Sequence, residues 1–522
     1  MASSALFVMG ATLGSTILGF AREIVSAKFY GTQWQLDTYL AAAMIPTILF
    51  GVFNGALVSA MVPTISEYLV RGEREEAWRL GSTVVNLLAI VLTLCAVLGY
   101  VAAPLYVPVI AHGFPKPQMG VAIHMTRWLM PSIIAVGLSG VFSGVLNAFQ
   151  RFRAASIVGM TLNVVTIACV VLLNHRLGIF ALVAGTALGL VAQMLVQIPA
   201  LLALGGYRFT LNLRHPGLKR MWGLLGPITL GSSAGQLALF FDRYFASTLP
   251  AGYIAGMSYA TKLVNFPQQI FAVAIATVIF PLLAMQYAQE NKEGVARSAI
   301  TGLRLVNFIT IPSVCALIVL AHPIVQTLFE RGRFGASSVD LTAGLLPYAA
   351  VGLLALAANV VLTRCLVACR QIVWQVGTAV FTVVLNIVLS ITWLPTLGAR
   401  GLLLANSVSQ TLQMIVLLIL VARFVAEIDW GKLLGSMAKI AACAFVMVVV
   451  LNWIASLGAA PQASLVSRAW FLFGQIAIGG LVFVAVARML DVEELSLAWR
   501  AIMAKFERNV IVPPENRDAP IT

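Results

Sequence analysis

The sequence predicts an all-α polytopic membrane protein with 14 transmembrane helices: two six-helix lobes related by an internal repeat, two extra C-terminal helices and a central cleft. Three observations lead to this prediction. Of the 522 residues, 60% are hydrophobic and 10% are charged, whereas a typical soluble protein has about 25% charged residues. Apolar runs of the roughly 20 residues that cross a bilayer follow one another along nearly the whole chain. Finally, the pattern of turn-forming and helix-breaking residues recurs after about 220 residues.

Each apolar run is far longer than the roughly 10-residue strands of a membrane barrel. We therefore expect helices, whose backbone polar groups are satisfied within the segment. The first run is not expected to be a cleavable signal peptide, because no basic residue precedes it and Arg22 and Glu23 interrupt its second half. The expected spans cover residues 2–29, 36–68, 81–111, 121–149, 154–174, 178–203, 221–249, 258–288, 297–320, 341–368, 371–393, 400–424, 432–455 and 468–490.

The internal repeat is visible in residues that fix backbone geometry. The segment Thr12–Ser15 reappears as Thr229–Ser232, and Pro63 corresponds to Pro281 at nearly the same offset. Prolines and glycines occupy particular backbone conformations, so a constant offset between them indicates duplication. Because each repeat contains an even number of segments, both start on the same side of the membrane, and the axis that relates them is expected to follow the membrane normal.

The chain is expected to divide into a first lobe, a cytoplasmic linker, a second lobe, two additional helices and a cytoplasmic end. Their residues are 1–205, 206–220, 221–424, 432–490 and 491–522, respectively. In the last part, Leu495, Trp499, Ile502 and Phe506 follow helical spacing. This spacing predicts an amphipathic helix that lies in the membrane interface or contacts a partner protein. Residues 513–522 are expected to be disordered.

The net charge of +14 is distributed by loop and does not form a single patch, which argues against nucleic acid as a partner. Lysine and arginine concentrate in the connections after even-numbered spans and in the C-terminal tail. Arg71, Arg74 and Arg79, for example, follow the second span. By the positive-inside rule, both termini are expected to be cytoplasmic.

No metal site or cofactor is expected. The six cysteines lie within or at the edges of apolar spans, without the spacing of a metal site, and are expected to act as buried small hydrophobic residues. Pairs such as Gly51 and Gly55 or Gly140 and Gly144 predict close helix packing within one chain, so a monomer is expected.

Charged residues inside the spans are the functional candidates, because each costs several kcal/mol unless it is paired or hydrated. Arg304 and Lys439 lie near predicted cytoplasmic ends, where their long side chains are expected to snorkel to water. The remaining candidates are Arg22, Glu23, Asp37, Arg127, Asp242, Arg243 and Lys262.

Arg22, Arg243 and Lys262 come from the first two spans of each repeat, and equivalent helices of a duplicated bundle line the same cleft. We therefore expect a cationic cleft that binds a phosphate or diphosphate, with Arg22 making a bidentate contact. Structural ion pairs are the alternative for two of the acids, Glu23 with a neighbour such as Lys28, and Asp242 with Arg243.

Several motifs resemble one known family. Leu18–Arg22, followed by Asp37, Ile45–Pro46 and Met61–Pro63, is similar to the opening of the MurJ (MviN) family of lipid II flippases, in the multidrug/oligosaccharidyl-lipid/polysaccharide exporter superfamily. In the second repeat, the similar segments are Asp242–Ser247, Tyr259–Leu263, Phe266–Pro267, Phe280–Pro281 and Glu330–Phe334. The resemblance covers nearly the whole chain.

This resemblance implies a bacterial inner-membrane protein that exports an undecaprenyl-diphosphate-linked peptidoglycan precursor by alternating access. The head group would occupy the central cleft, and the lipid tail a groove leading to the last two helices. Arg22 and Asp37 match family cavity positions, whereas Lys262 stands where arginine is usual. Two departures reduce the number of cations: Thr16 replaces a second arginine of the first span, and Phe50–Gly51 falls where the second span commonly carries one. Arg127 or Arg243 is the candidate to compensate.

Several functional readings follow. Arg22 and Lys262 would bridge the diphosphate from opposite lobes, and Asp37 would then compete for them to release the head group. Membrane potential would drive export, or Asp242 with Asn386 would hold a coupling Na⁺ or H⁺.

The alternative functions are an exporter of another polyprenyl-linked saccharide and a cation-coupled multidrug antiporter of the same superfamily. A membrane enzyme is disfavoured, because no loop has the size or the clustered carboxylates of a catalytic pocket. Expected partners are membrane lipids and cell-wall synthesis proteins.

Overall fold

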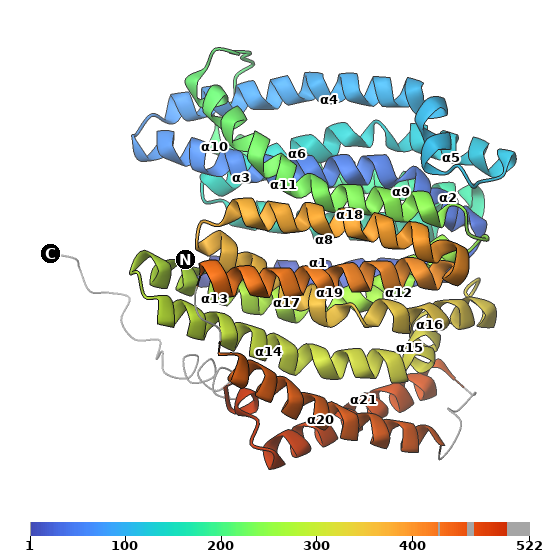
Figure 1. The fold of residues 1–522 in the computed structure, drawn as a ribbon. Coiled ribbons are helices and arrows are strands. Elements are labelled where there is room, and N and C mark those ends of the chain that lie inside the picture. The colour runs from blue at the N-terminus through green and yellow to red at the C-terminus, as the bar shows by residue number, and fades with distance from the viewer. Residues whose placement is uncertain (1, 426–428, 457–463, 498–522) are drawn as a thin grey trace, which may run out of the picture. The chain divides into compact units, whose positions relative to one another are not determined.

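The computed structural model describes residues 2–425, 429–456 and 464–497, and its regular elements are helices joined by short connections (Figure 1). The predicted all-α membrane fold class is therefore confirmed. The helices up to the linker are α1 (Ala2–Tyr30), α2 (Trp34–Ala42), α3 (Met44–Val70), α4 (Arg74–Ile110), α5 (Lys116–Leu129), α6 (Ser132–Ala148), α7 (Phe152–Ser156), α8 (Val158–Leu177), α9 (Phe180–Leu195) and α10 (Ile198–Leu204). Those that follow are α11 (Pro216–Ala246), α12 (Tyr253–Pro267), a π-helical turn (Gln268–Ala272), α13 (Val273–Ala288), α14 (Lys292–Val319), α15 (Ala321–Phe329), α16 (Ala336–Ala350), α17 (Leu353–Ala368), α18 (Ile372–Leu397), α19 (Ala399–Phe424), α20 (Trp430–Ser456) and α21 (Leu465–Met489).

Within the described residues, ten helical stretches are long and apolar enough to cross a membrane. An eleventh is added if α16 and α17, which meet at a 44° bend, are counted as one span. The other three expected spans coincide with α1, with α2 and α3, and with α11. The total of 14 membrane crossings stays a prediction.

Several spans that were expected to be continuous are interrupted. The segment 36–68 is divided at Ala43 into α2 and α3, and the segment 121–149 is divided at Met130 and Pro131 into α5 and α6. Within 258–288, the π-helical turn follows Pro267 directly. Proline removes a backbone donor and clashes with the preceding turn, and π turns are a recognised way to absorb such a break.

Two compact units are present. Unit 1 comprises Met1–Leu263, Leu328–Ala349 and Val376–Gln413. Its largest core described here packs α3, α4 and α6 together with the start of α11, around buried side chains such as Met61, Leu92 and Val141. The residues of the cationic cleft predicted above also belong to this unit: Arg22 on α1, Arg243 near the end of α11 and Lys262 on α12.

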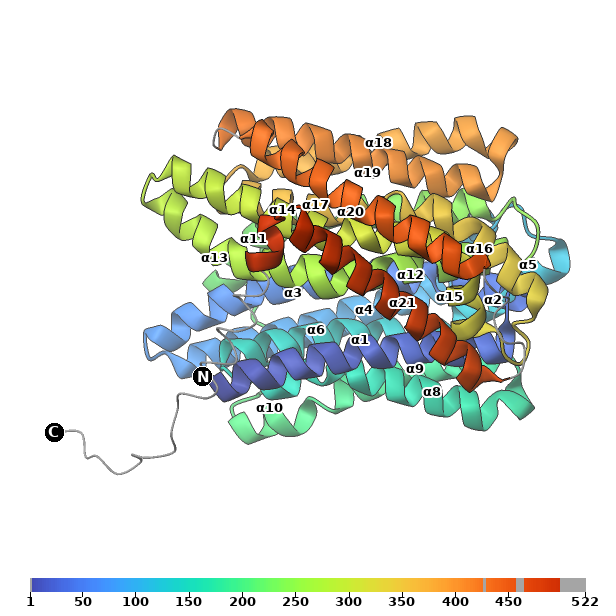
Figure 2. The same cartoon turned by 90° about the horizontal axis from the view of Figure 1, so that it is seen from below.

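Unit 2 comprises Val264–Thr327, Ala350–Gln375 and Met414–Thr522. Its core packs α13, α14 and α17 with the end of α19, around side chains such as Leu283, Leu303 and Val361. In this unit α20 lies beside α21 and beside α14 (Figures 1 and 2).

Three of the six cysteines are buried and one is exposed. Cys365, Cys369 and Cys443 are buried free thiols as expected, but Cys95 is exposed on α4.

Of the predicted C-terminal amphipathic helix, Trp499, Ile502 and Phe506 lie outside the described residues, as do residues 513–522.

Candidate functional site

Two neighbouring charges on α1 form the start of the site. The guanidinium Nη2 of Arg22 lies 2.9 Å from Oε1 of Glu23. The Arg22 side chain is 29% exposed and that of Glu23 only 12% exposed. A charged pair of this kind within an apolar helix indicates a polar cavity rather than a lipid-facing surface.

The second cation comes from α12. Lys262 forms an ion pair through Nζ with the other carboxylate oxygen of Glu23, Oε2. Glu23 thus lies between Arg22 and Lys262 and neutralises part of both charges. The expected local pairing of Glu23 is found with its neighbour Arg22 and not with Lys28, whose ammonium lies 5.5 Å from the centroid of the Phe29 ring. Sequence proximity could not reveal the second partner, because Lys262 is remote from Glu23 in the chain.

These residues line one cavity of about 450 Å³ within unit 1. Its charged lining residues are Arg22, Glu23, Arg243 and Lys262. Hydroxyl groups also reach it, and the remaining wall is largely aliphatic, from residues such as Leu129, Val136, Leu182, Leu190 and Leu239. A cavity that combines three cations, one carboxylate and apolar walls can take an anionic group attached to a hydrocarbon.

Arg243 is held by its own surroundings. Its Nη1 donates a 3.4 Å hydrogen bond to the carbonyl of Ile254, on the first turn of α12. On another side of the cavity, the hydroxyls of Tyr39 and Thr186 are hydrogen-bonded at 2.8 Å and join α2 to α9. Hydrogen bonds between different helices therefore hold Arg243, Tyr39 and Thr186 in the cavity lining.

Asp37 does not appear among the cavity-lining residues. Its side chain is 2% exposed and accepts hydrogen bonds from the backbone N–H groups of Gly252, at 2.5 Å, and Ala255, at 2.7 Å. Backbone N–H groups at a helix N-terminus have no partner within the helix, and a carboxylate there also interacts favourably with the helix dipole. Asp37 on α2 therefore caps the start of α12, the helix that carries Lys262. A pattern of residue types does not reveal such a contact with distant backbone atoms.

Arg127 lies elsewhere in unit 1. On α5, its Nε donates a 3.2 Å hydrogen bond to the carbonyl of Tyr100, and its guanidinium carbon is 5.3 Å from the centroid of the Tyr100 ring. The structure thus places Arg22, Arg243 and Lys262 around one cavity, whereas Arg127 contacts α4.

The two residues expected to hold a coupling cation lie on α11 and α18. Oδ1 of Asp242 is buried without a hydrogen-bond partner in the described structure, and so are both polar side-chain atoms of Asn386. Asn386 is 2% exposed. At the first of the two positions that depart from the resembled family, the Thr16 hydroxyl donates to the carbonyl of Thr12 at 3.0 Å. At the second position, the burial of Phe50 and Gly51 on α3 is outside what the structure describes.

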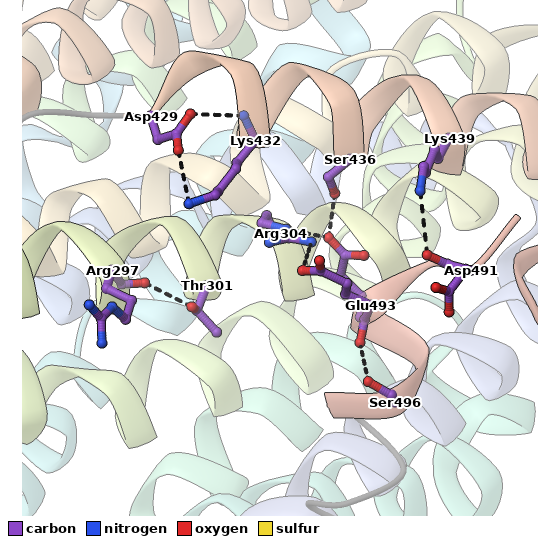
Figure 3. Close-up of polar contacts among 11 residues, drawn as sticks. Arg297, Thr301, Arg304, Asp429, Lys432, Ser436, Lys439, Asp491, Glu493 and Ser496 are labelled. Carbon is purple, nitrogen blue, oxygen red and sulfur yellow. Dashed lines mark hydrogen bonds and ion pairs between the residues drawn. The ribbon is translucent and has the colours of Figure 1, made fainter.

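A separate charge cluster lies in unit 2 (Figure 3). Arg304 on α14 pairs with Glu493, at 2.8 Å, and with Glu494, which also accepts from the Ser436 hydroxyl on α20. Lys439 Nζ donates to the Asp491 carbonyl at 3.4 Å. The expectation that Arg304 snorkels to water is wrong, because its side chain is 14% exposed and anchored by two carboxylates. The chain after α21 is thereby fastened to α14 and α20.

Long apolar helices around a cavity that holds buried charges define a multi-span membrane transport protein. Comparison with known protein families supports this class of protein. The family model described as "Lipid II flippase MurJ" matches residues 26–470. The chain therefore belongs to the MurJ family.

Individual relatives match over most of their length. A Vibrio cholerae protein named "Probable lipid II flippase MurJ" is 30% identical over 505 residues, which cover 94% of this chain and 96% of the relative. A Burkholderia cenocepacia protein named "Lipid II flippase MurJ" is 29% identical over 422 residues, or 79% of this chain and 82% of the relative.

Solved structures show the same fold. A structure titled "Lipid II flippase MurJ, inward closed conformation" gives a TM-score of 0.78 at 24% identity and covers 93% of this chain and 98% of its own. An inward-facing multidrug resistance MATE family transporter of the MOP superfamily gives 0.66 at 15% identity, with 83% and 99% covered. The predicted relationship to the MurJ family is confirmed, and the MATE transporter shares the fold.

Proposed function

We propose that this protein exports lipid II, an undecaprenyl-diphosphate-linked peptidoglycan precursor, from the inner to the outer leaflet of the bacterial cytoplasmic membrane by alternating access. The relatives named as lipid II flippases support the substrate class. The observation that carries the proposal is the Arg22–Glu23–Lys262 ion-pair network inside a partly apolar cavity. It offers two cations to a diphosphate and an apolar wall beside them.

In this mechanism substrate binding is an exchange of anions. Glu23 neutralises Arg22 and Lys262 while the site is empty, which avoids the cost of unpaired charges away from bulk water. The diphosphate takes the place of the carboxylate, with a bidentate contact to the planar Arg22 guanidinium and a point contact to the Lys262 ammonium. When the cavity opens outward, Glu23 pairs again with both cations and favours release.

In this proposal Glu23, and not Asp37 as the sequence suggested, is the anion that competes with the diphosphate for Arg22 and Lys262. Both oxygens of Asp37 are engaged by backbone amides of Gly252 and Ala255. A carboxylate bound in this way holds Lys262 in place through α12 and is poorly suited to leave for another cation.

The chemistry of the lining favours an anion over the cationic solutes of a multidrug antiporter. Among the charged residues of the cavity, Arg22, Arg243 and Lys262 face a single carboxylate, Glu23. A cationic drug would meet a net positive site, which disfavours its binding. An exporter of another polyprenyl-linked saccharide would share the diphosphate contact and differ only in its sugar contacts.

The proposed arrangement in the membrane follows the repeat. We take residues 1–205 and 221–424 as the two lobes that move during export, residues 432–490 as the helices beside the lipid tail, and both termini as cytoplasmic. An inside-negative potential assists export, because each negative charge moved outward gains about 2.3 kcal/mol per 100 mV. The protein is proposed to act as a monomer in contact with cell-wall synthesis proteins.

The proposal is tested by measuring lipid II flipping in proteoliposomes. Arg22→Ala is expected to lower the rate at least tenfold, whereas Arg127→Ala, a matched removal of an arginine outside the cavity, should keep most of it. Flipping should also accelerate under an imposed inside-negative potential. Equal rates for Arg22→Ala and the unmodified protein would contradict the proposed site, and indifference to potential would remove the proposed driving force.

A further inference from the structure

A second cavity in unit 1, of about 790 Å³, has a different chemistry from the charged one. It lies among α1, α3, the end of α6 and α7. Its polar lining comes from Thr12, Ser15, Thr16, Ser66, Asn147 and Gln150 together with Ser156, and no residue of this lining is charged. The nearby Arg153 does not line it, and its guanidinium carbon is 5.6 Å from the centroid of the Phe7 ring.

One side of this pocket is formed by the end of α6 and the connection to α7. Gln150 adopts a left-handed conformation (φ 57°), and the N–H of Arg151 donates to the carbonyl of Leu146 at 2.7 Å. This reversal follows the end of α6, and α7 starts two residues later. Asn147 on α6, Gln150 between the helices and Ser156 on α7 all line the pocket.

Several hydroxyls of this pocket are oriented by their own helices. Thr12 donates its proton to the carbonyl of Val8 at 2.8 Å, Thr16 to that of Thr12 at 3.0 Å, and Ser156 to that of Arg153 at 2.9 Å. A hydroxyl that donates in this way retains lone pairs as acceptors. Together with the amides of Asn147 and Gln150, the pocket suits a neutral ligand rich in O–H and N–H donors, and it offers nothing to neutralise a phosphate.

The position of this pocket along α1 relates it to the charged cavity. Ser15 and Arg22 are seven residues apart, which in an α-helix corresponds to two turns, about 10 Å, on the same face. Ser15 lines the neutral pocket and Arg22 the charged cavity. A ligand with its phosphate at Arg22 could therefore place the adjoining group beside Ser15 and Thr16.

We propose that this neutral pocket binds the saccharide that adjoins the diphosphate of the exported lipid. The inference rests on the proposed function, because it takes the diphosphate to be held at Arg22. Sugar hydroxyls and acetamido N–H groups are the donors that the back-bonded hydroxyls require. Thr16 lines this pocket on α1 and is then a specificity-determining residue: at this place the chain recognises a neutral group and not a charge.

The test compares two lipids that differ only in the sugar. Native mass spectrometry of the purified full-length protein measures the affinity for a polyprenyl diphosphate and for the same lipid carrying a neutral disaccharide of N-acetylated hexosamines. In the unmodified protein the disaccharide should strengthen binding roughly tenfold, the effect of two ordinary hydrogen bonds. In the double variant Ser15→Ala, Thr16→Val this gain should vanish while the bare diphosphate lipid binds as before.

Two further variants make the result specific. Ser66→Ala approaches the pocket from α3 and should reduce the gain about threefold. Thr93→Val removes an exposed hydroxyl that donates to the carbonyl of Ala89 in the same back-bonded manner, away from the pocket, and should leave the gain unchanged. If the gain is absent in the unmodified protein, or persists in the double variant, the saccharide proposal is overturned while diphosphate binding stands. If neither lipid binds, or if Arg22→Ala binds both normally, the proposed function itself fails.

Discussion

The backbone N–H of Ala255 donates a 2.7 Å hydrogen bond to Oδ1 of Asp37, which ties α2 to the first turn of α12. Lys262 follows Ala255 by seven residues, or about two turns, on the same helix. The rigid helix between them transmits the position of Asp37 to the ammonium group that pairs with Glu23. A buried carboxylate outside the cavity therefore helps to set the geometry inside it.

Replacement of Asp37 should destabilise the fold. Asp37→Ala removes two hydrogen bonds to a buried charge and leaves two backbone donors unpaired, so we expect a loss of about 2–4 kcal/mol. Asp37→Asn keeps one acceptor oxygen and should lose less. The free energy of unfolding in detergent, from denaturant titration, measures the effect. Asp429→Asn serves as the control, because its ion pair with Lys432 is exposed and is expected to contribute little to stability. An Asp37→Ala variant as stable as this control would contradict the capping role.

Removal of the negative charge at Glu23 should tighten the binding of anions. Glu23→Gln leaves Arg22 and Lys262 without their shared counter-ion, so pyrophosphate is expected to bind at least tenfold more tightly. Flipping is expected to slow, because the competing anion that assists release is gone. Calorimetric titration with pyrophosphate and the proteoliposome assay give the two readouts. Unchanged pyrophosphate affinity would mean that Glu23 does not occupy the substrate's place.

A coupling cation, if one is used, should depend on Asp242. Its Oδ1 is buried without a hydrogen-bond partner in the described structure, and the polar atoms of Asn386 are in the same condition. Asp242→Asn should therefore abolish any dependence of flipping on a sodium or proton gradient and leave its dependence on membrane potential intact. The measurement is the flipping rate with each gradient imposed separately. Gradient dependence that survives in Asp242→Asn would discard this site.

The segment after α21 should loosen when Glu494 loses its charge. Burial of this carboxyl opposes ionisation, but the hydrogen bonds from Arg304 and Ser436 outweigh it and lower the pKa of Glu494 below its usual value. A carboxyl with a lowered pKa stabilises the fold fully above its unfolded pKa of about 4.3, and the contribution is lost as pH falls through the lower folded value. Glu494→Gln should thus be less stable than the unmodified protein at pH 7, and the difference should shrink below about pH 4.

Unfolding midpoints across this pH range test the prediction. Glu493→Gln is the matched control, because the Glu493 side chain is 69% exposed, whereas that of Glu494 is 1% exposed, although both pair with Arg304. A stability difference for Glu494→Gln that stays constant with pH would show that the contact acts through packing and not through charge.

The sequence was most informative where a residue type conflicts with its surroundings. Arg22, Arg243 and Lys262 stand out as charges in apolar runs, and the structure places all three around one cavity. The fold class followed from the same composition, since few backbone arrangements are stable in a bilayer. The family motifs added a predicted direction of transport and a predicted substrate class, which composition alone does not contain.

Pairings between distant parts of the chain were not accessible in this way. Sequence neighbours suggest a local partner for Glu23, and Arg22 is one, but they do not point to its second cation, Lys262 on α12. The contacts of Asp37 with backbone amides leave no trace in residue types. The division of the segment 258–288 by a π-helical turn was missed, since Pro267 signals a break but not the form that it takes.

The Arg22–Glu23 pair also bears on how the chain enters the membrane during synthesis. Both partners belong to α1, so the positive charge already has its counter-ion when the first helix leaves the ribosome, long before α12 exists. A lone arginine at the centre of a helix opposes insertion by roughly 2.5–3.5 kcal/mol, and an adjacent carboxylate reduces that barrier at the earliest stage. When α12 is synthesised later, Glu23 is already in the bilayer and can pair with Lys262. The buried charges of the cavity can thus be inserted in successive steps, each with a counter-ion.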